Sequence, residues 1–120
     1  MDIETFRNYC LAKKAVTEEL TFGPDTLVFK IGGKIFALAG LDEVPLRVNL
    51  KCDPQKAISL REEYPDVILP GYHMNKKHWN TVVLDSFLAN TLIFGLTDHS
   101  YDLVLQGLPK KLRKELEDRE

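Results

Sequence analysis

Two adjacent glycines between two β-rich runs place the strongest local constraint on this chain. Gly32 and Gly33 separate residues 26–31 from residues 34–38, and both runs are rich in β-branched, aromatic and aliphatic side chains. Glycine adopts the positive φ angles that a two-residue hairpin turn requires. The segment therefore predicts an antiparallel hairpin.

The same turn determines which side chains share a face of the hairpin. A two-residue turn places Phe29 opposite Phe36 and Leu27 opposite Leu38, which gives one apolar face. The opposite face is mixed and carries Val28, Lys30, Ile35 and Ala37. We therefore expect the first face to cover a hydrophobic core.

Periodicity and capping residues predict the other elements. Residues 46–52 alternate between apolar and polar side chains, so they are expected to form a half-buried strand. Asp53 followed by Pro54 is typical of a helix N-terminus. The remaining expected elements are a helix over residues 2–14, a connection over 17–24, a helix from 54 to 64, strands over 67–72 and 79–84, and helices over 89–108 and 110–118.

This order of elements predicts a two-layer α+β fold. Five strands linked mainly by hairpins form a mainly antiparallel sheet, and the helices pack on one of its faces. The 120 residues, of which 44% are hydrophobic and 28% charged, are typical of one globular domain over residues 1–120. Collagen, coiled coils, disordered tails and disulfide scaffolds are poor interpretations of this composition.

Charge and cysteine content argue against several functional classes. The formal net charge is −2, whereas a nucleic-acid-binding chain is usually basic. The two cysteines, Cys10 and Cys52, lack the paired spacing of a zinc site and are expected to be reduced thiols. No apolar run is long enough to span a bilayer, and the N-terminus has no secretory signal. We expect a cytoplasmic protein that does not contact a membrane.

The middle third of the chain is its one basic part. Residues 46–80 carry six cations and four anions, whereas residues 1–45 and 81–120 each carry five cations and seven anions. Lysine, arginine and histidine side chains can contact phosphates, asparagine can bond a base edge or sugar, and tryptophan can stack. The candidate nucleic-acid contacts are Arg47, Lys51, His73, Asn75, Lys76, Lys77, His78 and Trp79. The alternative is a solvated sheet face with a charged turn that blocks edge pairing.

The sequence predicts no metal, no cofactor and no catalytic residue. His73 and His78 have no third ligand at a recognisable spacing, and no phosphate loop, nucleophile elbow or dinucleotide fingerprint is present. An enzyme with one of these histidines as general base is therefore the least favoured function. A second alternative is a pocket along residues 72–79 that binds or sequesters a planar aromatic molecule.

Four segments of the chain resemble the MmcQ/YjbR family. They are LVFKIGGKIFAL at residues 27–38, NLKCDP at 49–54, PGYHMNKKHWNTV at 70–82 and DHSYD at 98–102. The resemblance covers nearly the whole chain in order, and it implies a compact fold related to the bacterial frataxin homologue. It also implies a double-wing arrangement, in which sheet hairpins contact DNA. The acidic ridge that iron transfer would need is missing from residues 2–14.

Residues and resemblance together predict a small, non-catalytic binding protein. We expect it to contact DNA through the hairpins near residues 26–38 and 67–84, with a monomer as the favoured state. The family resemblance supplies no substrate, because shared fold alone does not determine function.

Overall fold

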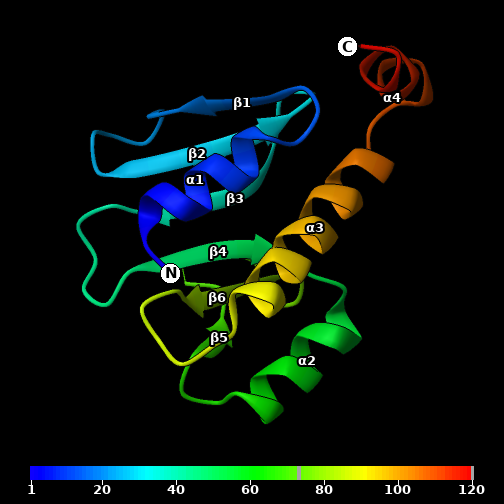
Figure 1. Cartoon of the computed structure of the whole chain (residues 1–120). Coiled ribbons are helices and arrows are strands. Elements are labelled where there is room, and N and C mark those ends of the chain that lie inside the picture. The colour runs from blue at the N-terminus through cyan, green and yellow to red at the C-terminus, as the bar shows by residue number, and fades with distance from the viewer. Residues whose placement is uncertain (73, 120) are drawn as a thin grey trace.

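The structure is a computed structural model that describes residues 1–72 and 74–119 (Figure 1). Its elements are, in chain order, α1 (Ile3–Leu11), β1 (Val16–Glu19), β2 (Thr26–Ile31), β3 (Lys34–Gly40), β4 (Arg47–Lys51), α2 (Pro54–Glu63), β5 (Ile68–Pro70), β6 (Trp79–Val83), α3 (Asn90–Gln106) and α4 (Lys110–Glu117).

The strands form one antiparallel sheet in the order β1-β2-β3-β4-β6-β5. This arrangement confirms the predicted α+β class. Asp53 caps α2 as predicted, because it accepts the N–H of Lys56 at 3.1 Å, and Asp2 caps α1 in the same way by accepting that of Thr5 at 2.8 Å.

The sheet has six strands rather than five, because part of the expected connection over residues 17–24 is the edge strand β1. Ala15 has a φ of 60°, which reverses the chain after α1 and lets Val16 pair with Ile31. The Arg7 guanidinium on α1 bonds Glu18 at 2.7 Å and holds the strand from the helix side. Val-Thr-Glu-Glu contains one apolar residue, so it has no alternation for sequence periodicity to detect.

The Gly32–Gly33 turn is as predicted. The two residues have φ angles of 59° and 79°, and Ile31 pairs with Lys34 across them. A side chain at the first glycine would also clash, because its Cβ would lie 2.6 Å from a methyl carbon of Leu108.

The expected pairing beyond the turn is wrong by one residue, because a β-bulge lies between Phe29 and Lys30 and leaves Phe36 of β3 as the extra residue. Phe29 lies opposite Ala37 rather than Phe36, and Val28 rather than Leu27 lies opposite Leu38. Phe36 and Ala37 are both fully buried. A bulge places two residues of one strand against one residue of its partner, so the side-chain alternation shifts.

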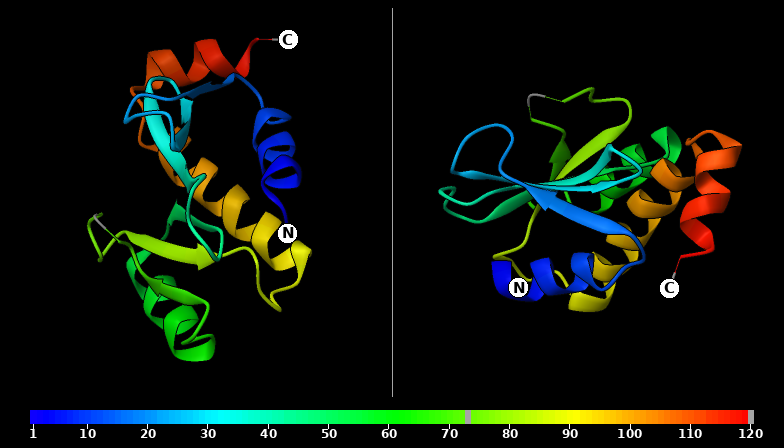
Figure 2. Two further views of the ribbon diagram at one scale, coloured as in Figure 1. Left: turned by 90° about the vertical axis from the view of Figure 1, so that its left-hand side faces the viewer. Right: turned by 90° about the horizontal axis from the view of Figure 1, so that it is seen from above.

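Helices cover one face of this sheet, as predicted, and leave the other face open (Figure 2). Phe6 of α1 packs edge-on against Phe29, and α3 contacts β2, β3 and β4. Leu60 of α2 joins the same core, and Leu116 of α4 packs near the Gly32 turn. Within the described residues, no helix is both long and apolar enough to cross a membrane.

Candidate nucleic-acid interface

The β2–β3 turn, on the right in Figure 1, lies at the end of the sheet where the β5–β6 connection enters β6. The antiparallel order requires this, because Lys34 begins β3, Lys51 ends β4 and Trp79 begins β6. We call this region the hairpin end.

A cavity of about 490 Å³ opens at the hairpin end. Lys30, Lys34 and Lys51 line it together with Trp79, and residues of α3 form its apolar wall. No carboxylate is among the described residues that line it. We call it the lysine cavity. Glu19 contacts it only indirectly, through an ion pair with Lys30 at 2.9 Å.

The lysine cavity exists because β3 extends beyond β4. The last pair of the β3–β4 ladder joins Ala37 to Leu50, so the start of β3 has no strand beside it there. The buried Ser100 of α3 bridges the gap: its Oγ donates to the carbonyl of Phe36 at 2.5 Å and accepts the N–H of Lys51 at 2.8 Å. This bridge fixes the backbone from which the Lys51 side chain extends.

Two further predicted cations lie beside the lysine cavity. Lys76 and Lys77 are exposed and line a groove of about 270 Å³ against the first turn of α2. Arg61 also lines it, but its guanidinium bonds Asn80 Oδ1 at 2.7 Å and the backbone oxygens of Trp79 and Lys76. The arginine therefore fastens the β5–β6 connection to α2, whereas the two lysines face solvent.

The other predicted residues of this connection shape its backbone. Asn75 Oδ1 accepts the N–H of Lys77 at 2.9 Å, which closes a local turn. His78 donates its N–H to the Asn75 carbonyl at 3.1 Å and accepts the N–H of Cys52 at 2.8 Å. His73 lies outside the described residues.

Arg47 is separate from the other predicted contacts. It lies four residues before Lys51 on the same face of β4, a separation of about 13 Å along a strand. It lines a different cavity, with Tyr72 and Asn49. The structure thus divides the predicted site into two groups and adds Lys30 and Lys34 to the group at the hairpin end.

Lys30 and Lys34 were missed because their neighbours are not local in sequence. Both flank the glycine turn, and the only sequence signal was the position of Lys30 on the mixed face of the hairpin. Their approach to Lys51 depends on how far β3 extends past β4, which the turn does not specify.

Both cysteine thiols are buried. Burial raises the pKa of Cys52, and that of Cys10 to about 12, so neither thiol is a ready nucleophile. Among the described residues, no three His, Cys, Asp or Glu side chains are placed to hold a metal ion.

Comparisons with known proteins assign the family. The YjbR family model matches residues 11–103. The chain is 49% identical to Escherichia coli YbdF over 94 residues, which is 78% of this chain and 75% of that protein. It is 34% identical to Escherichia coli YjbR over 114 residues, which is 95% of this chain and 96% of that protein. The names of these two relatives state no activity.

Solved structures agree with the fold. The crystal structure of Deinococcus radiodurans protein DR2400, with domain DUF419, has a TM-score of 0.90 and 40% identity, covering 96% of this chain and 87% of that chain. A crystal structure of a Pseudomonas syringae protein has a TM-score of 0.72 and 28% identity, covering 87% of this chain and 99% of that chain. Family model, relatives and structures together show that this chain belongs to the YjbR family, also called MmcQ/YjbR.

Proposed function

We propose that this chain binds nucleic acid through the hairpin end, as a non-catalytic monomer in the cytoplasm. The lysine cavity carries the proposal, because three lysines and Trp79 meet there with no carboxylate in its described lining. Lysines can neutralise phosphates, and an indole can stack on a base. The two hairpin connections that flank the cavity would act as the wings of the double-wing hypothesis.

Charge separation along the sheet explains how a chain with a net charge of −2 can present a basic surface. Four connections lie at the opposite end, over residues 20–25, 41–46, 64–67 and 84–89, and we call this the acidic end. They contain no lysine or arginine, and their five carboxylates belong to Asp25, Asp42, Glu43, Asp66 and Asp85. The hairpin end therefore has a positive local charge that the sum over the chain conceals.

The test is fluorescence anisotropy of labelled duplex and single-stranded DNA at low and near-physiological salt. A Lys34→Ala/Lys51→Ala double variant should bind DNA more weakly. For duplex DNA, the slope of the logarithm of the binding constant against the logarithm of the salt concentration should become shallower by about 2, since each phosphate contact contributes about 0.9. Lys76→Ala/Lys77→Ala should also weaken binding. Neither the Lys34 nor the Lys51 side chain has a hydrogen bond or ion pair to another described residue, so the fold should persist.

The matched control is Lys110→Ala/Lys111→Ala, which removes the same charge from exposed residues of α4 that line neither cation-rich cavity. Equal weakening in this control would mean that net charge, rather than the lysine cavity, governs binding. Wild-type affinity in the Lys34/Lys51 variant, or no binding by the wild type even at low salt, would overturn the proposal.

A further inference from the structure

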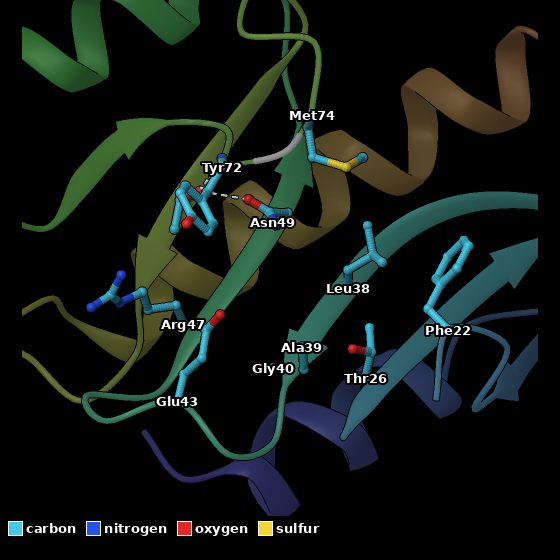
Figure 3. Close-up of a pocket in the computed structure, with 11 residues that line it drawn as sticks. Phe22, Thr26, Leu38, Ala39, Gly40, Glu43, Arg47, Asn49, Tyr72 and Met74 are labelled. Carbon is cyan, nitrogen blue, oxygen red and sulfur yellow. Dashed lines mark hydrogen bonds between the residues drawn. The ribbon is translucent and has the colours of Figure 1, made fainter. Parts of the chain in front are cut away.

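A second cavity, of about 370 Å³, lies on the open face of the sheet toward the acidic end (Figure 3). Phe22 and Tyr72 line it from different connections, and Leu38, Glu43 and Asn49 also line it. We call it the outer groove. We propose that the outer groove binds a small planar aromatic cation that carries amino groups. This site is independent of the nucleic-acid proposal.

The sequence builds the apolar part of the outer groove through two local devices. The β-bulge between Phe29 and Lys30 turns Leu38 toward the open face, where Val28 lies opposite it. Phe22 and Tyr72 remain 63% and 61% exposed, although large aromatic side chains are usually buried. Exposed aromatic side chains beside a concave surface are typical of a binding site for a flat ligand.

Backbone contacts hold Tyr72 at the edge of the groove. The N–H of Gly71 donates to the carbonyl of Trp79 at 2.9 Å, and a Cβ at Gly71 would lie 2.8 Å from the Cβ of Trp79. Only glycine fits this close approach. The next N–H, that of Tyr72, donates to Thr81 Oγ1 at 3.0 Å, so the chain crosses the edge of the open face at this point.

Glu43 is the only carboxylate among the described residues that line the groove, and Arg47 is the only cation among them. A Cβ at Gly40 would lie 2.7 Å from the Glu43 carboxyl carbon, so the glycine leaves the space in which this side chain folds over β3. Glu43 has no ion pair with another described residue. In Figure 3 the Arg47 side chain extends away from Leu38 and Phe22, so it does not cover this side of the groove. An unpaired carboxylate beside aromatic side chains favours a cationic aromatic ligand.

The floor of the groove provides hydrogen-bond donors for the same ligand. Thr81 Oγ1 donates to Asn49 Oδ1 at 2.5 Å, and the Asn49 amide nitrogen donates to no other described residue. A ring nitrogen or carbonyl on the ligand would satisfy such donors, and the volume suits a molecule of a few fused rings.

The probe for the test is proflavine, a planar cation with two amino groups, and 9-anthracenecarboxylate is the anionic comparison. Tyr72 and Trp79 line different cavities, so Trp79 fluorescence would not report this site directly. Polarisation of the dye's own fluorescence is therefore the readout, with protein free of nucleic acid. We expect saturable proflavine binding that is tighter than binding of the anion.

Three variants locate the bound dye. Tyr72→Ala and Phe22→Ala should each weaken proflavine binding, and Glu43→Gln should weaken it about tenfold because a charged hydrogen bond is lost. Phe87→Ala and Glu62→Gln are matched controls, since both residues are exposed and lie outside the outer groove. The proposal is overturned if proflavine does not saturate, if the anion binds more tightly, or if the controls weaken binding as much as the groove variants. The Lys34→Ala/Lys51→Ala variant should bind proflavine normally, which separates this result from that of the DNA assay.

Discussion

Replacement of Ser100 by alanine tests how α3 holds the end of the sheet. Because Ala37 pairs with Leu50, the next rung of the β3–β4 ladder would join Phe36 to Lys51. The Ser100 hydroxyl occupies that rung, since it donates to the Phe36 carbonyl and accepts the Lys51 N–H. Alanine fits the space but leaves both backbone groups without this partner.

The expected loss follows from the two groups left unpaired. A buried donor or acceptor without a partner costs about 1–3 kcal/mol. Two such groups are left, and partial closing of the β3 and β4 ends recovers some of the loss, so Ser100→Ala should lower the free energy of unfolding by about 2–4 kcal/mol. Total stabilities of about 5–15 kcal/mol make this a large effect. Thr97→Val on the same helix is the matched control. Its hydroxyl bonds the Ile93 carbonyl at 2.8 Å, which the helix ladder already supplies with a donor, so its loss should cost less than about 1 kcal/mol.

Urea unfolding followed by circular dichroism measures both variants. A lower midpoint at an unchanged m-value would show a loss of stability without a change in the unfolded state. The reasoning is refuted if Ser100→Ala loses less than about 1 kcal/mol, or if the two variants lose equal amounts, because the direct rung then forms without the hydroxyl.

Three further predictions concern pH, close packing and helix propensity. Burial lowers the pKa of His99, whose Nε2 accepts the Asp53 N–H at 3.1 Å, so the unfolded chain binds the proton first as pH falls. Stability should be fully present above about pH 6.5 and decline below it, and His99→Gln should reduce this decline in urea midpoints. Gly71→Ala should cost about 1–3 kcal/mol because its Cβ meets Trp79, and it should also weaken proflavine binding. Gly95→Ala, with nothing within 4 Å of the added Cβ, should instead stabilise by about 0.5–1 kcal/mol in the same melts.

Sequence reasoning predicted those parts of the fold that local chemistry determines. Gly32 and Gly33 allow one kind of turn, Asp53 and Pro54 start a helix, and strict alternation identifies β4. The bulge between Phe29 and Lys30 has no such signal, because the residues around it suit a regular strand equally well. It forms where two adjacent residues of β3 both reach the core, which is a property of the packed sheet.

The candidate site was predicted in part for the same reason. Lys51 and Trp79 were each predicted as a contact, without being placed together, and the β4–β6 register sets them opposite each other. Lys34 was not grouped with them, since only the offset between β3 and β4 brings it to the lysine cavity. Tyr72 and Trp79 were assigned to one pocket. In the structure the chain approaches Trp79 closely at Gly71, and the two side chains line two different cavities.

The separation between the two ends determines how net charge acts on binding. Residues 47–51 alone span about 13 Å along β4, which exceeds the Debye length of about 8 Å at physiological salt. Carboxylates at the acidic end are then screened from a phosphate at the lysine cavity, so the local charge governs the contact. At 0.01 M salt the Debye length grows to about 30 Å, comparable with the molecule's 40 Å long axis. The acidic end then also repels the DNA, so the gain in affinity from lowering the salt should level off, even though the phosphate contacts are unchanged.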